Sequence, residues 1–183
     1  MVSYQANYDT AITYLRVGLE DRAKESLEKT LESVPGNEKT NDNIVYLKTL
    51  FLLSKINLEK NNMKEALQYL DEGLHVKKDH ADLLFLWSLC LGNAKRYDEM
   101  FASLIRYLVS LTARDEDRYE YEFSGDAALG EVCDKLIPLS YTHSSTPQEF
   151  CAIVRQLAEK TQSPAINKAL ETITAIDHNG LQG

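Results

Sequence analysis

The sequence repeats itself with a period of 34 residues, and this period limits the possible folds more than any other feature. A shift of 34 superimposes residues 62–74 on residues 96–108. The first 37 residues give another copy, which matches the second copy with a shift of 43, so we expect an insertion of nine residues between them. In each copy, apolar residues recur at the spacing of two amphipathic helices that are separated by a polar break. A period of roughly 20 to 50 residues is typical of stacked units, each too small to bury its apolar face alone.

The residues that the copies share resemble the tetratricopeptide repeat, a hairpin of two antiparallel helices. The first copy matches the family pattern at Ala11, Tyr14, Ala23, Leu27 and Pro35. The second and third copies match it at Leu50, Leu53, Ser54, Ala66, Leu70, Leu84, Trp87, Ser88 and Leu104. Other family positions hold different residues, namely Asn7, Asn57, Lys78, Met100 and Thr112. The resemblance implies an all-α fold in which three hairpins form a right-handed α–α superhelix (solenoid). The expected hairpins are 4–37, 47–80 and 81–114, with the insertion at 38–46.

The last third of the chain follows a different pattern. An acidic run predicts an exposed loop over 115–125, which contains Tyr119 and Tyr121. Three helical patterns follow within 126–178. We expect them to form a divergent fourth hairpin and a capping helix, because the end of a repeat array needs a polar outer face.

Prolines and one glycine mark expected helix ends. Pro138 is expected to end or kink its helix, because it lacks a backbone N–H. Thr146 begins a capping-box pattern with Pro147 at the first helical position, and Pro164 opens the last helix in the same way. Gly18 is expected at the turn inside the first hairpin, since glycine accepts a positive φ.

Composition narrows the classes of function. Gly and Pro number only 8 and 4, which argues against a β-sandwich or barrel with its many turns. The formal net charge of −8 disfavours binding to nucleic acids or anionic membranes, since both require Lys and Arg. The densest apolar stretch, residues 83–92, is about half as long as a membrane-spanning helix. No signal-peptide pattern and no paired cysteine spacing are present, so we expect a cytoplasmic location.

The sequence shows no constellation of catalytic residues. Its four histidines form no metal-binding pair, and the phosphate-binding and nucleophile-elbow motifs are missing. We therefore expect no enzymatic activity, no cofactor and no metal. The cysteines lie on apolar stripes and are expected to be buried: Cys90, Cys133 and Cys151. The acidic pairs Asp71–Glu72 and Asp98–Glu99 are expected on solvated faces.

Stacked hairpins form a concave surface that binds partners, and in tetratricopeptide proteins the first helix of each repeat lines it. All three copies place an aromatic residue at one position of this helix: Tyr8, Phe51 and Phe85. The expected groove also contains Ile12, Arg16, Lys48, Lys55 and Leu89. An aromatic ladder with a few cations suits an extended or helical peptide that has apolar anchors and some acidity. The alternative is that the three aromatic residues pack in the core between repeats.

These observations favour a non-catalytic scaffold or adaptor that binds a protein or peptide partner, and exposed repeat ends favour self-association. The two-carboxylate clamp of chaperone-tail receptors is absent, since the corresponding positions hold Tyr8, Ile12, Leu52, Asp82 and Leu86. Two alternatives stay open. The stretch 80–108 resembles the repeat regions that follow the catalytic domain of some bacterial family-2 glycosyltransferases, which implies an accessory region of a larger enzyme. A peptide-pheromone sensor is less favoured, because the chain has no room for the helix-turn-helix domain of such sensors.

Overall fold

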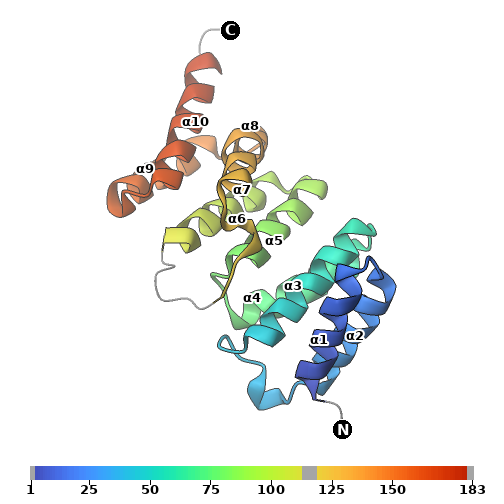
Figure 1. Cartoon of the computed structure of the whole chain (residues 1–183). Coiled ribbons are helices and arrows are strands. Elements are labelled where there is room, and N and C mark those ends of the chain that lie inside the picture. The colour runs from blue at the N-terminus through green and yellow to red at the C-terminus, as the bar shows by residue number, and fades with distance from the viewer. Residues whose placement is uncertain (1–2, 113–118, 181–183) are drawn as a thin grey trace. The chain divides into compact units, whose positions relative to one another are not determined.

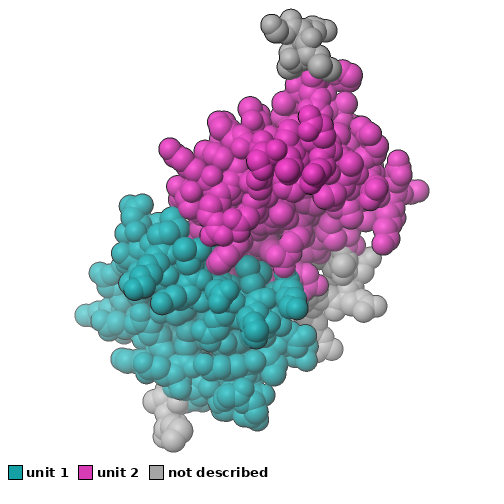
Figure 2. All heavy atoms as spheres, turned by 180° about the vertical axis from the view of Figure 1, so that it is seen from behind, with its two compact units in different colours: residues 1–78 teal, residues 79–183 magenta. Residues whose placement is uncertain are grey.

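The computed structural model of the chain describes residues 3–112 and 119–180, and every regular element in these stretches is helical (Figure 1). The all-α prediction is therefore confirmed for the described residues. No helix in this part of the chain is both long and apolar enough to cross a membrane. The chain divides into two compact units, Met1–Lys78 and Asp79–Gly183, which Figure 2 colours separately.

The first unit consists of two helical hairpins joined by a short 3-10 turn. Its elements are α1 (Tyr4–Arg16), α2 (Glu20–Ser33), η1 (Gly36–Glu38), α3 (Ile44–Glu59) and α4 (Met63–Val76). α1 packs against α2, α3 packs against α4, and α2 contacts α3. Two clusters of buried apolar side chains hold these helices together: Ala11, Leu27, Leu53 and Ile56 in one, and Val34, Tyr46 and Leu50 in the other.

The second unit begins with a further hairpin, α5 (Ala81–Asn93) and α6 (Tyr97–Ser110). The remaining elements are the 3-10 turn η3 (Glu122–Ser124), α7 (Asp126–Glu131), the π-helical turn η4 (Val132–Leu136), α8 (Ile137–Thr142), α9 (Pro147–Thr161) and α10 (Pro164–Gly180). α5 packs against α6, and α8 packs against both α6 and α10. α9 pairs with α10, as Figure 1 shows in red tones.

The three hairpins share one kind of turn. Gly18, Asn61 and Lys95 all have left-handed backbone angles, with φ of 74°, 58° and 57°. In each turn, two backbone hydrogen bonds of the Schellman type close the end of the preceding helix. These three positions are separated by the shifts of 43 and 34 that the sequence shows, and so are the first residues of α2, α4 and α6. The sequence repeat thus corresponds to a repeat of backbone geometry, and the expected turn at Gly18 is confirmed.

The third hairpin packs differently from the other two at one position. Met100 is buried, and a Cβ placed on Gly92 would lie 3.0 Å from its sulfur atom. The aligned pairs in the other hairpins are Leu15–Ala23 and Leu58–Ala66. The third hairpin therefore carries its large residue on the second helix instead of the first. This exchange accounts for a large residue at position 100, where the other two copies have alanine.

Pro138 distorts its helix without ending it. The residues before it form the π-helical turn η4, and the helix continues as α8 to Thr142. A proline cannot donate to the carbonyl four residues earlier, and its ring crowds that carbonyl. The wider π-turn accommodates both effects, so the helix does not end at Pro138.

Two helix starts differ in detail from the sequence prediction. α3 begins at Ile44, inside the expected insertion at 38–46, because the Asn43 side chain accepts a hydrogen bond from the third residue of the helix. α9 begins at Pro147 as predicted, but the Thr146 side chain makes no capping hydrogen bond. The prediction of a capping box at Thr146 is therefore wrong, although its position is right.

Candidate peptide-binding site

Six of the eight predicted groove residues lie in the first unit, on α1 and α3: Tyr8, Ile12, Arg16, Lys48, Phe51 and Lys55. Tyr8 is half-buried and packs against the cluster that contains Ala11 and Leu27. Phe51 is buried, whereas Arg16 is exposed at the last position of α1. Part of the Tyr8 ring thus belongs to the core of this unit, and the groove role of the six residues stays a prediction.

The other two predicted residues, Phe85 and Leu89, lie on α5 in the second unit. Leu89 is half-buried. The Phe85 ring stacks on Phe123 with centroids 4.3 Å apart and an interplanar angle of 26°. It also lies 5.7 Å from the Tyr107 ring. Phe85 therefore contacts a segment of its own chain that lies 38 residues further on.

This segment, residues 119–124, is not the exposed loop that its acidic composition predicts. Its aromatic residues, Tyr119, Tyr121 and Phe123, are buried or half-buried. The two glutamates between them, Glu120 and Glu122, are exposed. Figure 1 shows the segment in gold beside α5. The expectation of an exposed loop is wrong for these residues, because the aromatic side chains at every second position pack against His80 and Phe85. Residues 115–118 of the predicted loop lie outside the described residues.

Asp82 binds the main chain of the 119–124 segment. Its carboxylate is 1% exposed and accepts two successive backbone N–H groups, that of Glu122 at Oδ2 (3.0 Å) and that of Phe123 at Oδ1 (2.8 Å). The first N–H groups of any helical turn point away from it and need an outside acceptor. Asp82 thus caps the 3-10 turn η3 from another helix, through hydrogen bonds that its charge strengthens. The Tyr107 hydroxyl donates to the carbonyl of Phe123.

His80 contacts the first half of the segment. It is the N-cap residue of α5, and its Nδ1 accepts the N–H of Leu83 (3.4 Å). The rings of Tyr119 and Tyr121 meet the imidazole edge-on, with centroids 4.4 and 5.0 Å away. Aromatic pairs of this geometry contribute about 0.5–1.5 kcal/mol each beyond their buried area. Side-chain contacts therefore add to the main-chain hydrogen bonds.

We name His80, Asp82, Phe85 and Tyr107 the α5–α6 cradle. It holds residues 119–124 of its own chain through main-chain hydrogen bonds and aromatic contacts, which are also the kinds of contact by which proteins bind peptides. Sequence reasoning identified Phe85 but missed the roles of Asp82 and Tyr107. The alternation of aromatic and acidic residues over 119–123 is the signal that could have pointed to them.

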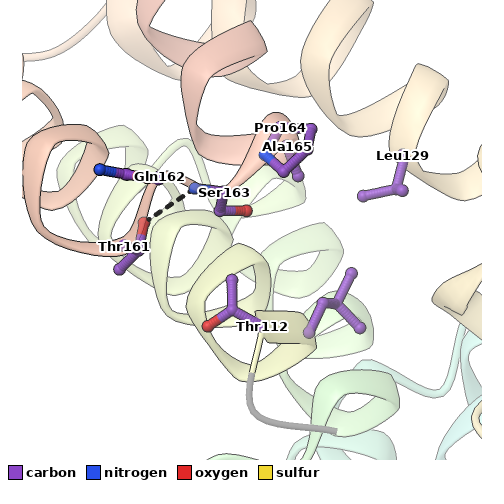
Figure 3. A pocket seen from close by; sticks show the side chains of 8 residues that line it. Thr112, Leu129, Thr161, Gln162, Ser163, Pro164 and Ala165 are labelled. Carbon is purple, nitrogen blue, oxygen red and sulfur yellow. Dashed lines mark hydrogen bonds between the residues drawn. The ribbon is translucent and has the colours of Figure 1, made fainter. Parts of the chain in front are cut away.

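A pocket of about 410 Å³ opens elsewhere in the second unit (Figure 3). It is lined by Leu111, Thr112, Leu129, Thr161, Gln162, Ser163, Pro164 and Ala165. Within it, the N–H of Ser163 donates to the Thr161 hydroxyl (3.3 Å). None of the described lining residues carries a charge, so the polar groups that they offer a ligand are hydroxyl, amide and main-chain groups. A pocket of about 580 Å³ in the first unit lies beside Lys60, which pairs with Asp21.

Asp98 does not lie on a purely solvated face as predicted. It accepts hydrogen bonds from the Ser144 hydroxyl (2.6 Å) and from both the N–H (2.9 Å) and the hydroxyl of Ser145. These bonds favour the charged carboxylate and hold the pKa of Asp98 below its usual value. In the other acidic pair, Asp71 is exposed, but Glu72 accepts a hydrogen bond from the Tyr46 hydroxyl (2.5 Å). Asp98 and Glu72 thus connect elements of the fold.

The three cysteines are free and buried, as predicted. Burial raises the pKa of the Cys90 thiol to about 11 and also raises the pKa of Cys133. Both thiols therefore stay protonated at neutral pH, which makes them poor nucleophiles. Among the described residues, no group of three or more His, Cys, Asp or Glu side chains is arranged to hold a metal ion.

Comparison with known proteins assigns no family. No protein-family model matches the chain, and no curated protein matches it. The interpretation of the cradle therefore depends on its own geometry.

Proposed function

We propose that the chain is a non-catalytic scaffold or adaptor that binds a protein or peptide partner, with its hairpins stacked as a tetratricopeptide-like solenoid. The observation that carries this proposal is the binding of residues 119–124 by the α5–α6 cradle. Asp82 and Tyr107 bind the main chain of that segment, and Phe85 stacks on one of its rings. A surface that binds one peptide segment in this way has the chemistry to bind another.

The repeated turn geometry supports the same proposal for the first unit. Because α1, α3 and α5 end in the same kind of turn, aligned residues occupy equivalent positions in their hairpins. Tyr8, Phe51 and Phe85 are such aligned residues. Arg16 and Lys48 add positive charge on α1 and α3, which suits a partner with some acidity.

The test is capture of partners from a native lysate by the immobilised chain. The variant Arg16→Glu/Lys48→Glu reverses two charges of the proposed groove, and Lys29→Glu/Lys64→Glu is its control. The control residues are exposed on α2 and α4, and both variants have the same net charge. We expect capture of specific partners to fall about tenfold or more only in the groove variant, which corresponds to about 1.4 kcal/mol.

Circular dichroism must show that both variants keep the helical content of the wild-type chain. Two results would contradict the proposed function. One is equal capture by the groove variant and its control. The other is a wild-type chain that enriches no protein over blank resin.

A further inference from the structure

The 119–124 segment occupies the α5–α6 cradle as a bound peptide would. Residues 119–123 have the sequence Tyr-Glu-Tyr-Glu-Phe, with an aromatic residue at every second position. The aromatic rings contact His80 and Phe85, whereas the two glutamates are exposed. Burial of alternate side chains is typical of a peptide that lies with one side against a protein surface.

The hydrogen bonds of the cradle do not depend on the sequence of the segment. Asp82 accepts two main-chain N–H groups, and Tyr107 donates to a main-chain carbonyl. Every residue except proline offers both kinds of group. Among the contacts between described residues, the aromatic ones depend on side chains and therefore select among peptides, so the cradle suits a segment that has the same alternation.

Removal of the segment would leave the cradle in an unfavourable state. Asp82 is 1% exposed, and a buried carboxylate that loses hydrogen-bond donors is destabilised until other donors replace them. Phe85 is 6% exposed, and loss of the Phe123 ring would bring its apolar face into water. A second peptide that supplies successive N–H groups and an aromatic ring would restore both kinds of interaction.

We propose that residues 119–124 are an intramolecular ligand, which occupies the cradle until a partner peptide with alternating aromatic and acidic residues displaces it. This inference rests on the proposed scaffold function and adds to it the chemistry of the partner. Because the segment belongs to the same chain, its effective concentration is on the order of millimolar. A free peptide of equal intrinsic affinity must reach that concentration to compete.

The test measures binding of a fluorescent synthetic peptide, with the sequence of residues 119–124, to the whole chain by fluorescence anisotropy. The variant Tyr121→Ser/Phe123→Ser weakens the intramolecular ligand and leaves the four cradle residues unchanged. We expect this release variant to bind the peptide at least about tenfold more tightly than the wild-type chain does, because its competitor is weakened. A control peptide with the same residues in the order Tyr-Tyr-Phe-Glu-Glu-Ser should bind the release variant at least about tenfold more weakly.

A substitution in the cradle tests whether the synthetic peptide binds there. Adding Asp82→Asn to the release variant should abolish the gain, because an amide accepts with its oxygen but presents donors on its nitrogen. Asp71→Asn, at an exposed position of α4, is the matched control and should leave the gain unchanged. If the release variant loses helical content, Glu122→Pro replaces it. That variant removes one N–H that Asp82 binds and keeps all three aromatic rings.

A folded release variant that binds the peptide no more tightly than the wild-type chain overturns this proposal. Equal binding of the two peptides overturns it as well. Neither result contradicts the scaffold function, which the lysate capture with the Arg16→Glu/Lys48→Glu variant tests separately. Conversely, a wild-type chain that enriches no protein from lysate over blank resin contradicts the scaffold function, whatever the synthetic peptide does.

Discussion

Replacing Gly18 with alanine and Lys95 with glycine should change the stability of the chain in opposite directions. The two residues occupy the same position in two aligned turns, and both have left-handed backbone angles, with φ of 74° and 57°. This conformation costs an L-residue roughly 1–2 kcal/mol, whereas glycine adopts it without strain. Gly18→Ala introduces that cost, and Lys95→Gly removes it.

The net effects are smaller than this cost, because glycine also gives the unfolded chain more conformational freedom. A change from glycine to alanine stabilises by about 0.4–1 kcal/mol through the unfolded state. Gly18→Ala should therefore lower the free energy of unfolding by about 1 kcal/mol, and Lys95→Gly should raise it by a similar amount. No atom lies within 4 Å of a Cβ placed on Gly18, so a steric clash adds nothing. Asn61→Gly should have a smaller effect, since asparagine tolerates this conformation.

Urea unfolding followed by far-ultraviolet circular dichroism measures these free energies, provided that the denaturant dependence stays equal among the variants. Lys95→Ala is the control, because it removes the same charged group but keeps the Cβ and its backbone cost. Its free energy of unfolding should lie close to that of the wild-type chain. The reasoning is refuted if Lys95→Gly destabilises the chain, or if Lys95→Ala stabilises it as much as the glycine variant does.

Three other properties of the chain can be tested, one by urea unfolding, one by NMR titration and one by thiol labelling. Gly92→Leu should destabilise by about 1–3 kcal/mol through overpacking against Met100, and adding Met100→Ala should recover most of the loss; additive effects in urea unfolding would contradict this compensation. The pKa of Asp98, followed by NMR titration, should lie below that of an aspartate in an unfolded peptide, because Ser144 and Ser145 donate hydrogen bonds to its carboxylate. Because this pKa is depressed in the folded chain, the stabilisation is present above the unfolded pKa and is lost as the pH falls through the folded pKa, and Asp98→Asn should remove this acid dependence. A thiol reagent should modify Cys90 and Cys133 no faster than the chain unfolds, and rapid labelling of folded protein would contradict their burial.

The hairpins could be predicted from the sequence because the information that forms them is local. Apolar spacing indicated the helices, and the turns that the structure shows at Gly18, Asn61 and Lys95 are separated by the same shifts of 43 and 34 as the sequence copies. Glycine itself indicated only the first of these turns. At the other two turns the left-handed residue is asparagine, which tolerates this conformation, and lysine, which does not favour it; Schellman hydrogen bonds close both turns. The alignment of the copies was therefore more informative than the residue at any one turn.

The side-chain packing at individual residues could be predicted less well than the hairpins. Met100 stands where the other two copies have alanine, and only the structure shows that Gly92 makes room for it. The two residues lie on different helices and compensate in volume, so neither is interpretable alone. Pro138 shows the same limit, because its effect depends on whether the preceding turn can widen.

The cradle joins residues about 40 positions apart, and its decisive contacts involve main-chain groups. Asp82 accepts from N–H groups, which almost every residue possesses, so no sequence pattern in α5 indicates that it holds residues 122 and 123. The acidic composition of 115–125 suggested solvent exposure, but composition ignores order. The order of the residues in 119–123 indicates burial instead, since an aromatic residue at every second position gives the segment one apolar side. A surface that binds main-chain groups is therefore hard to find from its own sequence, whereas the segment that it holds shows a pattern, which here is the alternation of aromatic and acidic residues in 119–123.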